Sequence, residues 1–390
     1  MNWHAARIVG VMQHTLAVEE APAVRTLRAL QDRALAANAS DLHFEPTSSG
    51  GRVRLRVDGL LRDCETLDTT LYLPLISRVK LLAGMDIADR RQPQDGRYAI
   101  PSPKGEVDAR VSSIPTIDGE KVVIRLLDVN AKSPSLDELG MSCGILTRYR
   151  RMIASPHGFL IVTGPTGSGK TTTLYSSVRE IADRTRSVCT VEDPVEMRLD
   201  GIAQVNVNAR AGLDFAAVLR SFLRQDPNVI MIGEMRDAAT ASIAISAALS
   251  GQLVLTTLHS NDAPRSIDRL LELGLARHAI GAALFGVLSQ RLVRRLCIEC
   301  RAFDAVSRSY IPVGCISCGR AGYRGRTGLF ELLEVNDEIR DAVTAGASVV
   351  ALRNLAARAG FEPLAADGSA KIVSGATSRD EIRRVLGAAG

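Results

Sequence analysis

The first third of the chain changes between helical and strand-like spacing of its apolar side chains. Apolar residues recur on one helical face at residues 24–37, and a second helix is predicted at 73–83. Between them, strict alternation at 52–57 followed by the turn residues Asp58 and Gly59 predicts a β-hairpin. Further strands are predicted at residues 42–45, 98–100, 107–113 and 121–126.

The rest of the chain follows another pattern, in which short continuous apolar runs alternate with helix-compatible stretches. Runs at residues 159–162, 188–191, 229–232 and 253–258 predict buried strands, and this alternation is typical of a parallel sheet with helices on both faces. A polar stretch around Pro134 separates the two patterns. We therefore predict a lead at 1–23, an α/β domain at 24–129, a linker at 130–136 and a larger α/β domain at 137–390.

Composition narrows the class of protein. The chain has 390 residues, of which 46% are hydrophobic and 23% charged, as expected for a globular protein. No apolar run approaches the roughly 18 residues that span a bilayer, and the N-terminus lacks the pattern of a signal peptide, so we expect a cytoplasmic protein. A net charge of +5 and an aromatic content of 4% argue against direct binding of nucleic acid.

The most specific motif is GPTGSGKT, a complete phosphate-binding loop between a predicted strand and a helix predicted at residues 172–181. Backbone N–H groups of such a loop and the positive end of the following helix hold a triphosphate. Lys170 is expected to reach the β and γ phosphates, and the Thr171 hydroxyl is expected to bind Mg²⁺. The predicted nucleotide-binding residues are Gly164, Pro165, Thr166, Gly167, Ser168, Gly169, Lys170, Thr171 and Thr172.

Three more predicted strands end in polar residues at the edge of the sheet where ligands bind in such folds. The strand at 188–191 is followed by Glu192, Asp193 and Glu196. Glu234 follows the strand at 229–232 and is the candidate to polarise an attacking water. His259 follows the strand at 253–258; a lone histidine is commonly a core or surface residue, but this position favours a sensor of the γ phosphate.

Four cysteines form two C-x2-C pairs, which can supply the four thiolates of a structural zinc site. These are Cys297, Cys300, Cys315 and Cys318. The module, at 291–326, holds eight arginines against Glu299 and Asp304, a basic surface that could meet anionic lipid, an acidic partner, phosphates or only solvent. Helices are predicted to follow at 330–390.

Taken together, the motifs resemble the ATPases of type II secretion and type IV pilus assembly. The strings that carry the resemblance, which covers about residues 24–386, are GPTGSGKTTTLY, TVEDPVE, LRQDPNVIMIGEMRD, TTLHSNDA, the four cysteines and GYRGRTGLFELL, with ASDLHFEP, RVDGLLRD and RVKLLAGMDIADRRQPQDGR in the first half. The resemblance implies a RecA-like P-loop ATPase domain, a smaller N-terminal α/β domain that is PAS-like, and a four-cysteine zinc module.

The resemblance also assigns roles to residues. It makes Lys170 and Thr171 the Walker A residues, Glu234 the Walker B glutamate and His259 a member of the His box. Glu192, Asp193 and Glu196 belong to the Asp box, and Gly233 stands where many P-loop enzymes carry an aspartate, so Mg²⁺ is expected to depend on Thr171 and on the Asp box through water. Arg110 and Arg125 match arginines that the N-terminal domain contributes to the nucleotide.

The implied function is that of a hexameric motor at the cytoplasmic side of the inner membrane. ATP hydrolysis would drive a membrane platform protein that adds pilin or pseudopilin subunits, and the zinc module would be a rigid knob for partner or membrane contact. Only about 23 residues precede the recognised part, whereas assembly motors usually carry a further N-terminal domain, so the particular machine stays open. A retraction motor, a DNA-uptake ATPase and an inactive nucleotide-binding scaffold are the alternatives.

Overall fold

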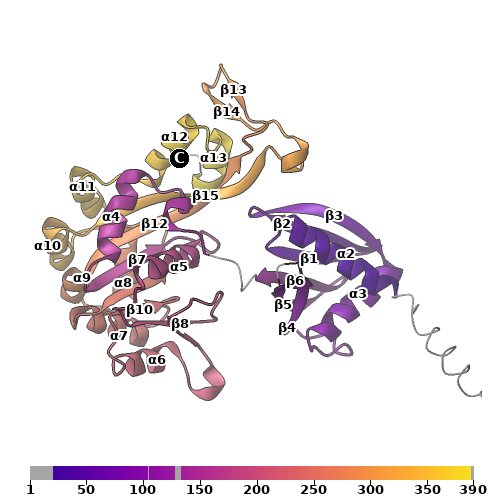
Figure 1. The fold of residues 1–390 in the computed structure, drawn as a ribbon, viewed down its shortest axis with the longest axis horizontal. Helices are drawn as coiled ribbons and strands as arrows, with labels where there is room; N and C mark the ends of the chain where they lie inside the picture. The colour runs from indigo at the N-terminus through magenta and orange to yellow at the C-terminus, as the bar shows by residue number, and fades with distance from the viewer. Residues whose placement is uncertain (1–20, 104, 128–132, 388–390) are drawn as a thin grey trace, which may run out of the picture. The chain divides into compact units, whose positions relative to one another are not determined.

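The structure is a computed structural model that describes residues 21–103, 105–127 and 133–387. The chain forms two compact units that divide after residue 130. Most of the predicted lead at 1–23 and the first part of the predicted linker at 130–136 lie outside the described residues. Each unit is built around its own sheet, and the elements are labelled in Figure 1.

The first unit contains a six-stranded antiparallel sheet in the order β3-β2-β1-β6-β5-β4, together with the helices α2 and α3 among its described residues. Its helices and strands confirm the elements predicted from the sequence. They are α2 (Pro22–Ala36), β1 (Asp41–Thr47), β2 (Gly50–Val57), β3 (Leu60–Asp68), α3 (Thr69–Leu82), β4 (Gln94–Ser102), β5 (Gly105–Thr116) and β6 (Gly119–Leu127).

Local chemistry explains how these elements meet. Asp58 and Gly59 have φ of +51° and +85°, the left-handed conformation that a two-residue hairpin turn requires between β2 and β3. The Asp68 carboxylate caps α3 by accepting from the backbone N–H of Leu71 at 3.0 Å. Apolar side chains of α2 and α3 pack on one face of the sheet, among them Leu30, and the opposite face carries charged side chains.

The second unit contains a seven-stranded mixed sheet in the order β15-β12-β7-β11-β10-β8-β9. Neighbouring strands from β12 to β9 are parallel, as predicted, but β15 runs antiparallel to β12. The two strands are joined by the cysteine module rather than by a crossover helix, which permits the antiparallel return. The strands are β7 (Gly158–Thr163), β8 (Val188–Glu192), β9 (Ala203–Asn206), β10 (Val229–Ile232), β11 (Leu253–Leu258), β12 (Leu284–Leu296) and β15 (Tyr323–Glu334), with a separate hairpin of β13 (Ala302–Asp304) and β14 (Ser309–Ile311).

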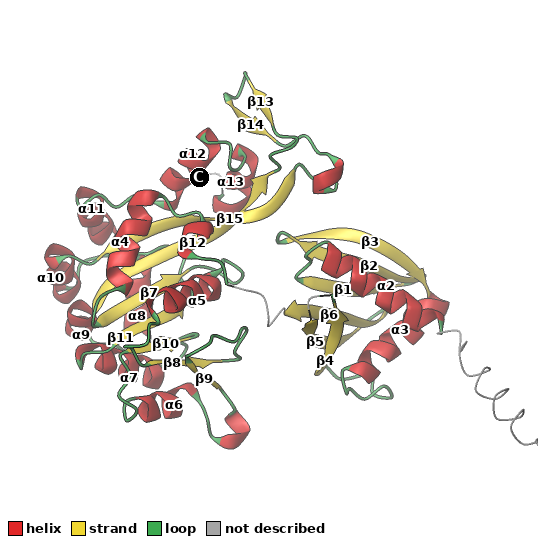
Figure 2. Cartoon of the chain, viewed as in Figure 1, coloured by secondary structure: helices red, strands yellow, loops and turns green. Residues whose placement is uncertain are grey.

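Helices cover both faces of this sheet, which Figure 2 colours by secondary structure. Along β7, Phe159 and Ile161 belong to one apolar core and Leu160 and Val162 to the other. The helices are α4 (Cys143–Ile153), α5 (Lys170–Ile181), α6 (Phe215–Phe222), α7 (Ala238–Leu249), α8 (Arg265–Glu272), α9 (Arg277–Ala283), α10 (Asp337–Ala345), α11 (Val349–Arg358), α12 (Leu364–Val373) and α13 (Arg379–Leu386), with short 3-10 turns at Leu136–Leu139, Ala209–Ala211 and Ile316–Cys318. The stretch predicted as C-terminal helices thus begins inside β15. Within the described ranges, no helix has both the length and the apolarity needed to cross a bilayer.

Candidate functional site

The phosphate-binding motif forms the turn between β7 and α5, as the sequence predicted. Gly164, Gly167 and Gly169 have φ of +148°, +76° and +88°, values that residues with a side chain rarely adopt. A Cβ on Gly164 would lie 2.5 Å from the carbonyl oxygen of Gln290, so space as well as conformation requires glycine there. Pro165, Thr166 and Gly167 are exposed, whereas Thr171 and Thr172 at the start of α5 are half-buried.

Lys170 is the first residue of α5, and its side chain folds over the loop. Its ammonium donates to the carbonyl oxygens of Gly164 and Pro165, at 2.9 and 3.0 Å. Burial lowers the pKa of Lys170 to about 8, although the negative charge of Glu234 opposes the shift. A cation desolvated in this way gains strongly from an anion placed beside it.

A residue that sequence reasoning missed supports the loop from β12. The buried Gln290 amide donates to the Ser168 carbonyl oxygen at 2.6 Å and accepts from the Thr173 hydroxyl at 2.8 Å. The Ser168 hydroxyl itself is buried and has no hydrogen-bond partner among the described residues, so it is a donor available to a bound phosphate. The signal in the sequence was Ser289-Gln290, a polar pair inside an otherwise apolar strand.

Glu192 ends β8, but its carboxylate is already fully engaged. The side chain is 2% exposed. One oxygen accepts from the Tyr175 hydroxyl, and the other accepts from the Thr190 hydroxyl at 2.6 Å and from the Gln204 amide at 3.2 Å. Burial and the neighbouring Glu192 charge raise the pKa of Tyr175 well above its usual range. Glu192 therefore contacts three donors of the protein itself.

Tyr175 carries this network from α5 to the loop after β8. Its hydroxyl oxygen accepts from the backbone N–H of Glu196 at 3.0 Å, so the helix that follows the phosphate loop is joined to the acidic segment. Asp193 and Glu196 are both exposed there. Of the predicted acidic group, one member is buried in the protein's own hydrogen bonds and two face solvent.

Glu234 follows β10 and lies in a different environment from Glu192. Its side chain is 18% exposed and forms an ion pair of 2.7 Å with Arg236. Its negative charge raises the pKa of both Lys170 and His259, against the larger lowering by burial. These three predicted residues are therefore close enough to interact electrostatically. Gly233 packs closely here, because a Cβ on it would lie 3.3 Å from the Glu192 Cα atom.

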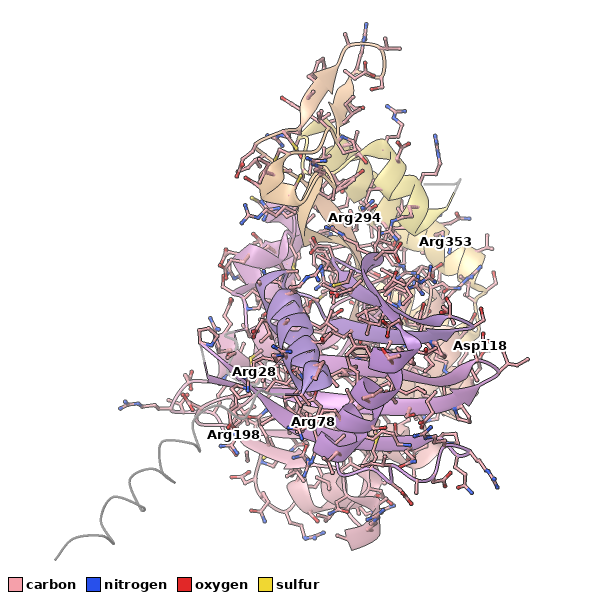
Figure 3. The ribbon with its side chains drawn as sticks, turned by 90° about the vertical axis from the view of Figure 1, so that its right-hand side faces the viewer. Arg28, Arg78, Asp118, Arg198, Arg294 and Arg353 are labelled. Carbon is pink, nitrogen blue, oxygen red and sulfur yellow. The ribbon has the colours of Figure 1, made fainter. Side chains whose placement is uncertain are left out.

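His259 follows β11 and lines a cavity of about 330 Å³. Burial and the positive charge of Lys170 lower the pKa of His259, so the neutral imidazole is favoured near pH 7. The cavity is also lined by Pro165 of the phosphate loop and by one side of α8 from Arg265 to Glu272. The loop between β11 and α8 is held by Asp262, whose carboxylate lies 2.8 Å from the guanidinium of Arg353. Arg353 is labelled in Figure 3. The lining residues are Pro165, His259, Ser260, Asn261, Arg265, Asp268, Arg269 and Glu272.

Arg110 and Arg125 belong to the first unit and pair directly across β5 and β6. Arg125 forms an ion pair of 3.1 Å with the buried Asp41, and Arg110 lies 3.7 Å from Asp108. Sequence reasoning missed Arg97, which pairs with Arg110 from β4 and extends the row to three strands. The structure therefore brings these two predicted residues together, and the other predicted site residues lie in the second unit.

The four cysteines converge, as expected for a metal site. Their sulfur atoms lie within 4.8 Å of one another, with separations of 3.8 Å for Cys297 and Cys315 and 3.9 Å for Cys300 and Cys318. Zinc–thiolate bonds of about 2.3 Å give a tetrahedron with edges of about 3.8 Å, so the set fits tetrahedral zinc. Burial raises the pKa of Cys318, but the backbone N–H groups of Cys315 and Gly322 and the neighbouring thiols of Cys315 and Cys300 lower it, which favours the thiolate ligand.

The chain matches the family described as Type II/IV secretion system protein over residues 17–384. It is 47% identical over 365 residues to the type II secretion system protein HxcR of Pseudomonas aeruginosa, covering 94% of this chain and 77% of that protein. It is 43% identical over 384 residues to the type IV pilus assembly ATPase PilB of Thermus thermophilus, covering 94% of this chain and 43% of PilB.

Solved structures show the same fold. The Legionella pneumophila ATPase DotB is 25% identical with a TM-score of 0.69, covering 92% of this chain and 95% of DotB. The pilus retraction motor PilT with bound ADP is 22% identical with a TM-score of 0.62, covering 92% of this chain and 96% of PilT. With the phosphate loop and the cysteine module in place, these matches give one conclusion: the chain belongs to the type II/IV secretion system protein family.

Proposed function

We propose that this protein is an ATP hydrolase that drives pilus or pseudopilus assembly, in type IV pilus biogenesis or type II protein secretion. The observation that carries the proposal is the phosphate loop between β7 and α5, with buried Lys170 next to Glu234 and His259. The similarity to a type II secretion system protein and to a type IV pilus assembly ATPase supports it. The DotB and PilT folds are compatible with a RecA-like ATPase domain.

In this proposal the loop amides, Lys170 and the Ser168 hydroxyl hold the phosphates of ATP. Thr171 would bind Mg²⁺, which neutralises charge between the β and γ phosphates. Glu234 polarises the attacking water, and neutral His259 donates a hydrogen bond to the γ phosphate. Of the other residues predicted to bind nucleotide, Thr166 lies in the loop and Thr172 lies in the first turn of α5.

We assign Glu192 a positioning role rather than contact with the reacting atoms. Its three protein donors support this assignment, since they leave its carboxylate little capacity for a further ligand. Through Tyr175 it fixes α5, and with it the loop that holds the phosphates. Asp193 and Glu196, which are exposed, are the members of the acidic group that would meet Mg²⁺ through water.

The first unit, which we propose is PAS-like, contributes Arg110 and Arg125 to the charge that develops on the γ phosphate. Supplying them only when the motor closes would make hydrolysis depend on closure. The proposed assembly is a homohexamer, cytoplasmic and peripheral to the inner membrane, acting on a platform protein and without direct contact to nucleic acid. The four cysteines would hold a structural Zn²⁺ that orders the module between β12 and β15.

The test is ATP turnover per chain of the purified protein, measured as a function of protein concentration. We expect turnover per chain to rise to a plateau, because ring assembly completes the site. Lys170→Ala, measured in parallel, should remove the activity at every concentration. Activity that is independent of concentration would contradict the ring, and a wild-type protein that binds ATP without hydrolysing it at any concentration would contradict the enzyme.

A further inference from the structure

The ring of His259 has no hydrogen bond of its own to fix its direction. Among the described residues, none forms a hydrogen bond with the imidazole, which lines the cavity beside the phosphate loop. Its position therefore depends on the backbone that carries it, residues 259–264 between β11 and α8, which we call the His259 loop. Whatever holds this loop decides whether the imidazole can reach a bound phosphate.

Arg291 of β12 holds the first part of the His259 loop. Its guanidinium donates to the Asn261 carbonyl oxygen at 2.6 Å and to the Gln290 carbonyl oxygen at 3.0 Å. Neighbouring side chains of a strand point to opposite faces, and the Gln290 side chain supports the phosphate loop through the Ser168 carbonyl oxygen. Two adjacent residues of β12 thus hold the two loops, and this strand sets the spacing between them.

Glu331 of β15 holds the end of the same loop. Its side chain is buried, and its two oxygens accept from the backbone N–H groups of Ala263 at 2.8 Å and of Leu364 at 3.0 Å. Ala263 belongs to the His259 loop, and Leu364 is the first residue of α12. Within the described ranges Glu331 forms no ion pair, and burial raises its pKa. A buried carboxylate without an opposite charge is costly to keep, which favours a role beyond packing.

Arg353 of α11 holds the loop from a third direction. Its guanidinium donates to one oxygen of Asp262 at 2.8 Å, while the other oxygen accepts from the backbone N–H of Arg265 at 2.9 Å. The Arg353 side chain is 46% exposed. Because an exposed ion pair adds little to folding stability, this contact can be removed with little effect on the rest of the protein.

We propose that Arg291, Glu331 and Arg353 are positioning residues, which hold the His259 loop so that its imidazole meets the γ phosphate of ATP. In this role none of the three touches the nucleotide. Glu331 and Arg353 join the loop to α12 and α11, so C-terminal helices that hold none of the predicted ATP-site residues take part in sensing the γ phosphate. This role rests on the proposed function, in which His259 donates to that phosphate.

The experiment compares the affinities of the full-length protein for MgADP and for the non-hydrolysable imido analogue of MgATP, measured by calorimetry. The ratio of the two affinities isolates the contribution of the γ phosphate. His259→Ala should shift the ratio against the analogue by about tenfold, the effect of one hydrogen bond to a charged group. Arg291→Gln and Glu331→Gln should approach that shift, and Arg353→Gln should give about threefold. ATP turnover should fall in the same order, while the affinity for MgADP stays close to that of the wild type.

Double variants with His259→Ala separate positioning from direct action. If the three residues act through His259, each substitution should add nothing to the shift of the ratio in that background. This control matters most for Arg291, whose charge also acts on Lys170. An Arg291→Gln substitution that keeps its full effect without His259 would show that Arg291 meets the phosphates itself, which contradicts the positioning role.

Two matched controls test for general effects of folding. Asp367→Asn changes another buried carboxylate between β15 and α12, which accepts from the Phe330 backbone N–H at 2.9 Å. It should lower stability toward urea and leave the affinity ratio unchanged. Arg358→Gln removes an exposed arginine of α11 that lies 3.9 Å from a carboxylate of α10, and it should change neither quantity.

Three results would overturn the positioning role: equal weakening of both nucleotides by Glu331→Gln, a shift of the ratio as large in Asp367→Asn, or no shift in His259→Ala. Where Glu331→Gln is too unstable to purify, the exposed Arg353→Gln decides. ATP turnover of the same preparations tests the proposed function separately. A wild type that shows these shifts but hydrolyses no ATP contradicts the proposed enzyme alone, and an active wild type whose variants keep its ratio contradicts the positioning role alone.

Discussion

The two sheets of this protein carry their charged residues in different places. In the second unit both faces of the sheet are covered by helices, and Glu192, Glu234 and His259 stand at the ends of its parallel strands. In the first unit both described helices pack on one face of the antiparallel sheet, and charged residues lie on the other face. Burial on both faces leaves a parallel sheet only its edge for chemistry, whereas an antiparallel sheet with one open face can use the middle of its strands.

The arginines on the open face of the first sheet also repel one another. Arg97, Arg110 and Arg125 are directly opposite one another on three adjoining strands, and their charges are offset by Asp41 beside Arg125 and by Asp108 beside Arg110. Like charges opposite each other in a sheet are destabilising. A row of arginines that repel one another would gain from binding an anion. This is the physical basis for giving Arg110 and Arg125 a role with ATP.

Arg110→Ala tests whether the arginine row of the first unit acts on ATP, and it should have the largest effect on turnover. We expect turnover to fall by about 10³-fold, at the lower end of the effect of arginines that act on a γ phosphate, while ATP affinity changes only a few-fold. Arg125→Ala should act in the same direction. The control is Arg52→Ala, which removes an exposed arginine of β2 that pairs with Glu45. Equal losses of affinity and turnover would show that the row binds the ground state instead.

At the edge of the second sheet, Glu234→Gln tests the assignment of the group that polarises water. We expect nucleotide binding to persist and turnover to fall by about 10²-fold, the contribution of a general base. Single-turnover kinetics with radiolabelled ATP separates chemistry from product release. Glu362→Gln, at an exposed position, serves as the control. Near-normal turnover in Glu234→Gln would remove Glu234 from this role.

Nucleotide affinity should depend on pH through Lys170. Burial lowers its pKa to about 8, so the free protein loses the ammonium charge as pH rises through 8. The bound phosphates favour the charged form, and nucleotide affinity should therefore be flat below pH 8 and fall by up to about tenfold for each pH unit above it. Calorimetry of MgADP binding at pH 8.5 in two buffers should detect uptake of roughly three-quarters of a proton, the fraction of Lys170 that is neutral at that pH. Binding without proton uptake would show that Lys170 is already charged in the free protein.

The sequence predicted the strands of the first sheet and β7, β8, β10 and β11 of the second, because alternating or continuous apolar runs follow from burial on one or both faces of a strand. It did not predict β9, β12 or β15 as strands. It did not predict the state of Glu192, since the Tyr175 and Gln204 donors come from distant parts of the chain. β15 was missed because residues 291–326 were assigned to the cysteine module and helices were predicted from residue 330, whereas β15 runs from Tyr323 to Glu334 and pairs antiparallel with β12. The position of Gln290 under the phosphate loop depends on the pairing of β12 with β7, which the sequence pattern alone does not reveal.

Glu192→Gln should have the smallest effect on turnover, and this distinguishes Glu192 from Glu234, the other carboxylate at the ends of the parallel strands. Glu192→Gln keeps the size of the side chain but replaces one acceptor oxygen with an NH₂ group, so that at least one of the three donors meets another donor. The free energy of unfolding should therefore fall by about 1–3 kcal/mol. Tyr175→Phe should destabilise the protein as well, and because the two share one hydrogen bond, the double variant should lose less than the sum. Turnover of Glu192→Gln should fall less than tenfold, with a KM for ATP close to that of the wild type. A loss of turnover as large as in Glu234→Gln, with unfolding unchanged in urea, would instead place Glu192 among the groups that touch the nucleotide.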